Sequence, residues 1–276
     1  MSIKYAYLGP AGTFTEAALQ KIATTSDQLI AFANVTAVLD AVRKGDCQKA
    51  LVPIENSVEG VVARTLDELA IGQPLVITTE TTLPVTFSLM TVNGKNPAEI
   101  KSIATHPHAE SQCRSFIAKN YPNVQIIESS STAAAAKGLS KGDYDAAIAA
   151  SNAAKNYDLK IIAENIGDNT GAVTRFVLVE KPGRKVGATG KDSTSLAVFI
   201  AIDHAGALLE ILNEFAKYQV NLTFIQSRPT GSQLGHYHFI IDAEGHIEDK
   251  LISAALAGLK EICEDIRFLG SYPQAR

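Results

Sequence analysis

The segment "PLVITTETTLPVTFSLMTV", residues 74–92, is rich in β-branched residues and has no helical periodicity. Such a run predicts an extended chain, and this one is much longer than an ordinary strand. We therefore predict that it crosses from one sheet into a second. A later extended stretch, "LKIIAENIGD" at 159–168, can cross back. Two crossings predict two α/β lobes with a ligand-binding cleft between them.

Short apolar runs alternate with helical patterns on both sides of these crossings, from the start of the chain to about residue 182. The run at 50–55, for example, precedes a helical pattern at 62–70. This alternation is typical of mostly parallel sheets covered by helices. Further strands are predicted at 4–9, 102–106, 124–129, 144–150 and 176–182.

A glycine-rich stretch, "GRKVGATGKDS" at 183–193, predicts a linker. We expect one domain at 1–182, with its second lobe at about 80–162, and another at 194–276. The last part has the order βαββαβ, which is the ferredoxin-like split motif. Its strands are predicted at 194–201, 221–229, 235–244 and 266–271, and its helices at 206–218 and 249–262.

The composition of the 276 residues is that of an ordinary globular protein, with 46% hydrophobic residues, 20% charged residues and a net charge of -4. It provides no basic surface for nucleic acid or for a membrane, and no apolar run approaches a membrane span. We expect a cytoplasmic protein. Cys47, Cys113 and Cys263 have no zinc or disulfide spacing, so we expect reduced thiols and no metal.

Two predicted helices begin with hydroxyl side chains directly after a strand. In "GPAGTFTEAAL", residues 9–19, Thr13 and Glu16 have the spacing of a capping box. In "SSSTAAAAKG", residues 129–138, Ser131 and Thr132 precede the helix. Each start either caps its helix or offers N–H groups to an anionic ligand.

Polar residues also follow the apolar strand in "VPIENSVEG", residues 52–60. Ligands bind at such strand ends in open α/β sheets. Glu55 could act as a general acid or base, or it could hold neighbouring backbone, and Asn56 and Ser57 lie beside it.

Two histidines and a cysteine occur in "THPHAESQC", residues 105–113. Their spacing matches none of the usual zinc motifs, which disfavours a metal site. His106 and Gln112 remain as neutral hydrogen-bonding groups near a strand end.

The strand "GAVTRFVLV", residues 171–179, begins with Thr174, Arg175 and Phe176. A hydroxyl and a guanidinium can bind a substrate, and arginine suits a carboxylate. Taken alone, the stretch is better explained as an ordinary strand entry with an exposed arginine.

Six motifs in this order, "GPAGTFTEAA", "VPIENSVEG", "THPHAESQC", "SSTAAAA", "VTRF" and a final domain with "GALLEIL" and "QSRP", closely resemble those of the prephenate dehydratases. The resemblance implies a two-lobed, periplasmic-binding-protein-like catalytic domain followed by a ferredoxin-like ACT regulatory domain. It also implies cofactor-free conversion of prephenate to phenylpyruvate, with loss of carbon dioxide and water, in phenylalanine biosynthesis.

The resemblance assigns roles to individual residues. Thr174 is the expected catalytic hydroxyl that assists the leaving group, Arg175 is expected to pair with a substrate carboxylate, and Phe176 to pack on the ring or the strand base. Glu55 is expected to orient its neighbours. The remaining residues expected at the substrate are Thr13, Asn56, Ser57, His106, Gln112, Ser131 and Thr132.

For the ACT domain, the resemblance implies feedback inhibition by phenylalanine and pairing into a homodimer or homotetramer. The effector would be bound by two segments, Gly206, Ala207 and Leu208 in one and Ser227, Arg228 and Pro229 in the other. The sequence departs from the family at two positions. Gln226 stands where glutamate is common, and Ala172 stands where asparagine is common, two residues before the threonine.

Two alternatives of other classes remain. The first is a non-catalytic amino-acid sensor, which would need Arg175 but not the hydroxyl of Thr174. The second is hydrolysis of a small ester or amide in the same cleft, which would need a base positioned beside a nucleophile.

Overall fold

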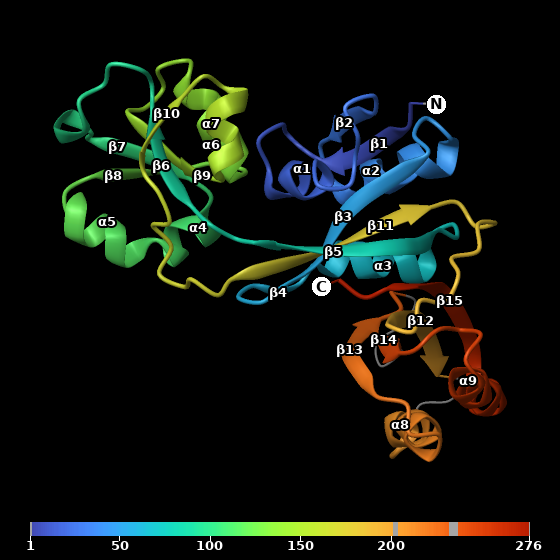
Figure 1. Ribbon diagram of the computed structural model, residues 1–276. Helices are drawn as coiled ribbons and strands as arrows, with labels where there is room; N and C mark the ends of the chain where they lie inside the picture. The colour runs from blue at the N-terminus through green and yellow to red at the C-terminus, as the bar shows by residue number, and fades with distance from the viewer. Residues whose placement is uncertain (1, 201–203, 232–236, 276) are drawn as a thin grey trace.

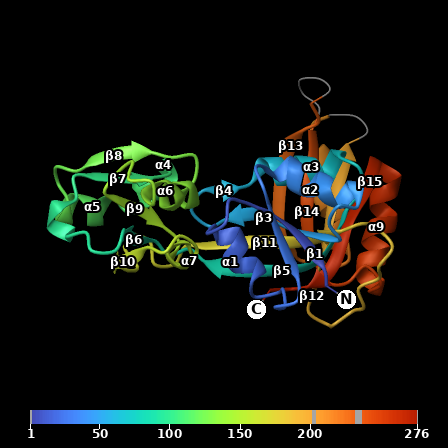
Figure 2. The same ribbon diagram turned by 90° about the horizontal axis from the view of Figure 1, so that it is seen from above.

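The computed structural model describes residues 2–200, 204–231 and 237–275. The chain forms two α/β lobes and a third, C-terminal unit built on its own sheet (Figure 1). In both views the C-terminal unit packs against the first lobe and lies away from the second (Figure 2). This confirms the fold class that the sequence predicts.

The first lobe is a sheet with the strand order β2-β1-β3-β11-β5, and β4 pairs with β3. Helix α1 covers one face, where it shares an apolar cluster with Tyr7, Leu51 and Phe176. Helices α2 and α3 cover part of the other face. The elements are β1 (Lys4–Leu8), α1 (Phe14–Leu19), β2 (Gln28–Phe32), α2 (Val35–Lys44), β3 (Lys49–Asn56), β4 (Gly60–Val61), α3 (Ala63–Ile71), β5 (Val76–Pro84) and β11 (Val173–Glu180).

The second lobe is a sheet with the order β10-β6-β9-β7-β8. Helix α6 is rich in alanine, so it packs closely on the small side chains of β9, among them Ala147 and Ala149. The elements are β6 (Ser88–Thr91), the short 3-10 helix Pro97–Glu99, β7 (Ser102–Thr105), α4 (Pro107–Gln112), α5 (Arg114–Asn120), β8 (Gln125–Glu128), α6 (Thr132–Leu139), β9 (Ala146–Ala149), α7 (Ser151–Asn156) and β10 (Lys160–Ala163).

The two predicted crossings are confirmed. The chain leaves the first sheet at the end of β5 and enters the second at β6, and it returns between β10 and β11. Figure 1 shows the two crossing segments side by side between the lobes. They are joined at the hinge, where Val85 N–H donates to the carbonyl of Ala172 at 2.7 Å. The side chain of Ala172 is buried in the apolar cluster of the second lobe.

The main strands of each sheet are mostly parallel, as predicted, and one strand in each runs against the others. In the first sheet β1 runs parallel to β2 and β3, but β11 is antiparallel to both β3 and β5. In the second sheet β6 is antiparallel to β9 and β10. The returning strand β11 enters the first sheet from the second lobe, and its direction is therefore set by the crossing.

The C-terminal unit has the predicted βαββαβ order and a sheet with the strand order β13-β14-β12-β15. Residue 201 of one predicted strand and residues 235 and 236 of another lie outside the described residues. No helix within the described ranges is long and apolar enough to cross a membrane. The elements are β12 (Asp192–Ile200), α8 (Ala207–Lys217), β13 (Leu222–Pro229), β14 (Tyr237–Glu244), α9 (Lys250–Ile262) and β15 (Cys263–Pro273).

The C-terminal sheet packs directly on the face of the first sheet that α1 leaves open. Ala197, Ile240 and Tyr272 share one buried cluster with Ile77 and Val177. The two sheets approach closely at Gly270, whose φ is +146° and whose position leaves no room for a Cβ beside Ile77.

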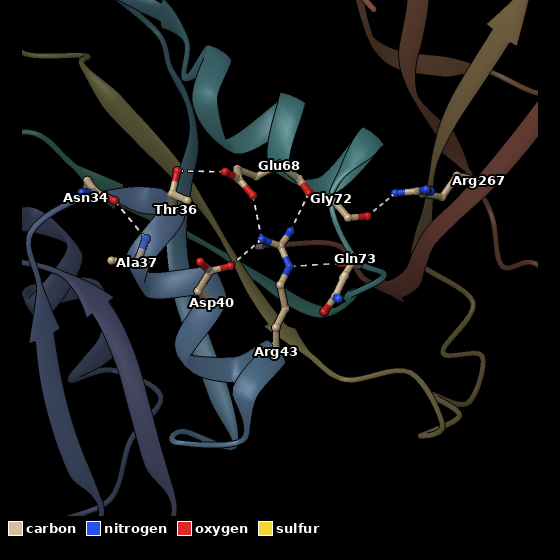
Figure 3. Close-up of polar contacts among 9 residues, drawn as sticks. All are labelled: Asn34, Thr36, Ala37, Asp40, Arg43, Glu68, Gly72, Gln73 and Arg267. Atoms are coloured by element: carbon tan, nitrogen blue, oxygen red, sulfur yellow. Dashed lines mark hydrogen bonds and ion pairs between the residues drawn. The ribbon is translucent and has the colours of Figure 1, made fainter.

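A polar contact at the end of α3 joins the same two units (Figure 3). Arg267 of β15 donates to the carbonyl of Gly72 at 2.6 Å. Beside it, the guanidinium of Arg43 bonds to the carboxylate and carbonyl of Glu68 and to the carbonyl of Gln73, so it fixes α2 against α3 (Figure 3). The docking surface for the C-terminal unit is therefore held in place by α2.

Candidate active site

A cavity of about 270 Å³ lies between the two lobes, where β3 and β11 of the first lobe face α4 and α6 of the second. Its size is near the lower end of small-molecule sites, which suits a ligand with one ring. One wall is apolar and the other carries hydroxyl, amide and imidazole groups. The lining residues are Phe14, Asn56, Val85, Phe87, His106, His108, Ala109, Gln112, Ser130, Ser131, Thr132 and Thr174.

Thr174 and Asn56 form a cross-strand pair on the first-lobe side of the cavity. They lie directly opposite each other in the β11–β3 ladder, and Asn56 Nδ2 donates to Thr174 Oγ1 at 2.8 Å. The amide oxygen of Asn56 accepts from the backbone N–H groups of Val58 and Glu59 at 2.8 and 2.9 Å, which fixes the orientation of the amide. Thr174 Oγ1 therefore accepts from Asn56, and its own O–H is left to donate into the cavity.

The second-lobe wall presents a neutral histidine. His106 Nδ1 accepts from the backbone N–H of His108 at 3.3 Å, where His106 caps α4. Burial, with the neighbouring ring of His108, lowers the pKa of His106. A neutral imidazole whose Nδ1 accepts carries its proton on Nε2. His106 can therefore donate a hydrogen bond in the cavity but is a poor base.

Two contacts at the mouth of the cavity join the lobes through Glu59. Gln112 Nε2 donates to one carboxylate oxygen of Glu59 at 2.9 Å, and His108 Nδ1 lies 3.3 Å from the other. These contacts reach from the turn after β3 to α4. The two lobes are thus in contact at the mouth of the cleft, and the cavity lies behind this contact.

Helix α7 makes further contacts between the lobes behind the cavity. Asn156 Nδ2 donates to the buried carboxylate of Glu16 at 2.7 Å, and Tyr157 donates to the carbonyl of Ala11 at 2.6 Å. Glu16 also accepts from Gly12 N–H at 2.6 Å, so its side chain joins both the capping turn and the opposite lobe.

Helix α6 begins at the cavity. Its N-cap Ser131 accepts from the N–H of Ala134, which confirms the predicted cap. Ser130 and Thr132, on either side, also line the cavity. The free N–H groups of the first turn and the positive end of the helix favour an anion there.

Four other predicted site residues lie outside the lining of this cavity. The hydroxyl of Thr13 caps α1 and donates to the carbonyl of Leu8, and the hydroxyl of Ser57 accepts from Val173 N–H. Phe176 is 1% exposed and packs under α1, at the base of the strand. Glu55 lines a separate cavity between the first sheet and the C-terminal unit. Adjacent residues of a strand point to opposite faces of the sheet, so Glu55 points away from the cleft because its neighbour Asn56 faces it.

Arg175 is not in the cleft, which corrects the expectation that it pairs with a substrate carboxylate there. Consecutive residues of a strand point to opposite faces, so Arg175 faces the C-terminal unit when Thr174 faces the cavity. Its guanidinium lies 2.7 Å from both Glu80 and Asp242. Burial lowers the pKa of Arg175, but Asp242, Tyr272 and Glu80 outweigh this effect and raise the pKa above its ordinary value.

The described lining of the cavity therefore contains no lysine or arginine. Sequence reasoning also missed its apolar wall, formed by Phe14, Val85 and Phe87, in which the rings of Phe14 and Phe87 meet edge to face at 5.6 Å. Val85 and Phe87 belong to the segment that crosses between the lobes. Because the cleft also lies between the lobes, side chains of this segment can border it. Within the described residues, no group of His, Cys, Asp and Glu side chains could hold a metal ion.

The predicted effector residues lie in two places on the C-terminal unit. Gly206 is the N-cap of α8 with φ +97°, a conformation that requires glycine, and Ala207 and Leu208 open the helix. Ser227, Arg228 and Pro229 end the edge strand β13. Arg228 makes a two-bond ion pair with Asp67 of α3, at 2.8 Å for each bond.

The fold and the site define a two-lobed enzyme cleft joined to a ferredoxin-like regulatory module. Residues 5–184 match the model of the family "Prephenate dehydratase", and residues 194–261 match the ACT domain. A prephenate dehydratase of Amycolatopsis methanolica is 43% identical over 273 residues, which cover 99% of this chain and 89% of that protein.

Two solved structures are also similar. The crystal structure of prephenate dehydratase from Arthrobacter aurescens in complex with L-Phe is 48% identical, with a TM-score of 0.93, and the match covers 99% of this chain and 90% of that one. A protein described as a novel type of quorum quenching acylase is 27% identical, with a TM-score of 0.87 over 98% and 97% of the two chains. The chain thus belongs to the prephenate dehydratase family. The expected lyase class and ACT domain are confirmed.

Proposed function

We propose that the cavity between the lobes is the active site and that Thr174 assists the departure of the ring hydroxyl of prephenate. In this reaction the bond from the ring to its carboxylate breaks, and the electron pair enters the ring as carbon dioxide leaves. The ring carbon–oxygen bond breaks with its own electron pair, and a proton from solvent completes water. Because the ring becomes aromatic, the substrate supplies the driving force.

The single observation that carries this proposal is the hydrogen bond from Asn56 to Thr174. It leaves the Thr174 proton available to donate to the leaving oxygen, and that bond strengthens as negative charge develops there. Thr174 is only 8% exposed, so water competes weakly for the same position.

The helix and side-chain donors on the second lobe would hold the carboxylate of the dianion that remains in the product. The start of α6 offers N–H groups with the hydroxyls of Ser131 and Thr132, and His106 offers its Nε2–H. Gln112 and Asn56 complete the polar wall. The apolar wall of Phe14 and Phe87 would pack on the ring and leave the departing carboxylate poorly solvated, which favours its loss.

The acylase among the similar structures raises ester or amide hydrolysis as a second candidate. That chemistry needs a general base beside a hydroxyl nucleophile. His106 presents a donor to the cavity, since its Nδ1 is occupied by the N–H of His108. The geometry therefore favours the lyase reaction over hydrolysis.

Phenylalanine is the effector we propose, because a similar solved structure with the same two domains contains it. The ligand would be bound by the α8 start at Gly206–Leu208 and by the end of β13 at Ser227–Pro229. We also propose a cytoplasmic homodimer or homotetramer that forms through the ACT domain. Support for this assembly comes from the position of β13 at the edge of the sheet that the described residues form, together with the exposed apolar side chains Leu208, Leu209, Ile225 and Tyr237.

The test is steady-state kinetics of Thr174→Val and Thr174→Ser with prephenate and with arogenate. The valine variant keeps the shape but lacks the hydroxyl, so kcat should fall by roughly 10²–10⁴-fold, as expected for the loss of positioned acid catalysis. The serine variant should keep most of the activity. Both should retain stabilisation by bound substrate. A parent protein without turnover would favour the sensor alternative, and an active valine variant would exclude the role of the hydroxyl.

A further inference from the structure

The guanidinium of Arg175 connects the strand that bears Thr174 to the ACT sheet. Arg175 Nε donates to Glu80 of β5 at 2.7 Å, and Nη2 donates to the hydroxyl of Tyr272 of β15 at 3.0 Å. Nη1 forms an ion pair with the carboxylate of Asp242 of β14 at 2.7 Å. Asp242 and Tyr272 are both fully buried. Bonds from a guanidinium to buried carboxylates are among the strongest hydrogen bonds in proteins.

The acceptors on the ACT side belong to one rigid cluster. Ser195 Oγ on β12 lies 2.5 Å from both the carboxylate of Asp242 and the hydroxyl of Tyr272. Three of the four ACT strands, β12, β14 and β15, thus meet at the group that binds Arg175. A shift of the ACT sheet relative to the first lobe would act on this guanidinium directly.

On the catalytic side, Arg175 is one peptide unit from Thr174. Strand β11 lies inside the first sheet, with β3 on one side and β5 on the other. The ladder to β3 changes register between Arg175 and Phe176, so that Arg175 faces Glu55 and Phe176 faces Pro53. Such irregularities re-aim side chains beside active sites. The planar peptide bond transmits a movement of Arg175 to Thr174.

We propose that Arg175 is a positioning residue through which the ACT sheet sets the orientation of the Thr174 hydroxyl. This inference rests on the proposed function of Thr174. Other polar contacts also join the same units. Arg228 with Asp67 and Arg267 with the carbonyl of Gly72 reach α3 or its end, which carries no residue of the cavity. Ala275 N–H donates to Glu80, the same carboxylate that binds Arg175, so this contact belongs to the cluster around Arg175. Displacement of the ACT sheet then changes turnover more than substrate affinity.

The test substitutes Arg175 and its two partners on the ACT side, Asp242 and Tyr272, which do not line the cavity. Tyr272→Phe removes one acceptor of Arg175, Asp242→Asn removes a charge, and Arg175→Lys keeps the charge but loses the fork of donors. Each variant weakens the bonds that hold Arg175, and part of this loss should appear as weaker stabilisation of the transition state by Thr174. We therefore expect each variant to lower kcat by roughly 5- to 20-fold and to leave KM within about twofold. Arg267→Gln breaks a contact between the same two units and is the matched control, with kcat unchanged.

A double-mutant cycle separates positioning from a general loss of structure. In the Asn56→Ala background the hydroxyl of Thr174 has already lost its partner, so Tyr272→Phe should reduce kcat much less than it does in the parent. Additive losses would indicate a structural role and overturn the proposal.

Two further outcomes would contradict it. A raised KM for Arg175→Lys, with full activity of Tyr272→Phe and Asp242→Asn, would mean that Arg175 binds substrate. Equal losses in Arg267→Gln would mean that any weakening of the domain contact suffices. If the parent protein formed no phenylpyruvate, the proposed function would fail and this inference with it, whereas an active parent with silent variants would refute the inference alone.

Discussion

The substitution Asn56→Asp tests the orientation of the catalytic hydroxyl, because it replaces only the amide NH₂ group with a carboxylate oxygen. In the parent, Asn56 accepts from the N–H groups of Val58 and Glu59 and donates to Thr174. An aspartate carboxylate can still accept from both N–H groups, so the turn is preserved. It has no donor, however, and the hydroxyl of Thr174 must donate to it instead.

The magnitude follows from the bond that then has to be broken. To reach the leaving oxygen, Thr174 must give up a hydrogen bond to a charged acceptor, which costs about 1.5–3 kcal/mol. At ~1.4 kcal/mol for each tenfold change, kcat should fall by roughly 10- to 150-fold. The added negative charge at the cavity should also raise KM for a dianionic substrate.

The assay is the formation of phenylpyruvate over a range of prephenate concentrations, together with thermal unfolding to verify the fold. Asn34→Asp is the matched control, because Asn34 caps α2 through the same oxygen, to Ala37 N–H at 2.9 Å, and does not line the cavity. A kcat of Asn56→Asp within twofold of the parent would refute the reasoning that Asn56 directs the hydroxyl.

Two further predictions concern stability. Gly270→Ala should lower the free energy of unfolding by about 2–5 kcal/mol, because the new Cβ would lie 2.2 Å from the carbonyl oxygen of Ile77 and φ is +146°. In the control Gly187→Ala the new Cβ meets nothing within 4 Å, so the stability should not change. Urea unfolding measures both variants, and equal midpoints would contradict the prediction. The hydrogen bond from Lys95, with those from Lys101 N–H and Ser102, lowers the pKa of Asp145 to about 2 from 3.8. The ionised Asp145 therefore stabilises the fold above pH ~4, and the effect is lost as pH falls towards 2. The stability difference between parent and Lys95→Met should therefore be largest above pH ~4 and shrink towards pH 2, and a difference independent of pH would argue against the ion pair.

The order of strands, helices and crossings could be predicted from the sequence because it depends on the local pattern of apolar and polar residues. The extended run at 74–92 has no helical spacing and is too long for one strand, and the structure places β5 and β6 of two different sheets within it. The βαββαβ order of the C-terminal unit was readable in the same way. The direction of β11 was not, because nothing in its own residues records that it returns from another lobe.

At the candidate site, the sequence identified the polar residues Thr174, Asn56, His106 and Gln112, all of which the structure brings to one cavity. Asn56 ends β3 and His106 follows β7, where ligands of α/β sheets bind, whereas Thr174 lies at the start of β11 and Gln112 at the end of α4. Arg175 was assigned to the same place because it belongs to the "VTRF" motif beside Thr174 and because a guanidinium suits a carboxylate. In a strand, adjacency means the opposite face.

The sequence by itself therefore determined the two crossings, the order of the ACT domain and the residue types available for chemistry, since periodicity and motif order are local properties. Only the tertiary structure decided which side of β11 faces the cleft and what Arg175 contacts. Its partners Glu80 and Tyr272 are 95 and 97 residues away in the chain. The pairing of β5 with β11 brings Glu80 to Arg175, and the docking of the C-terminal unit brings Tyr272. The docking depends on the shapes of both surfaces together.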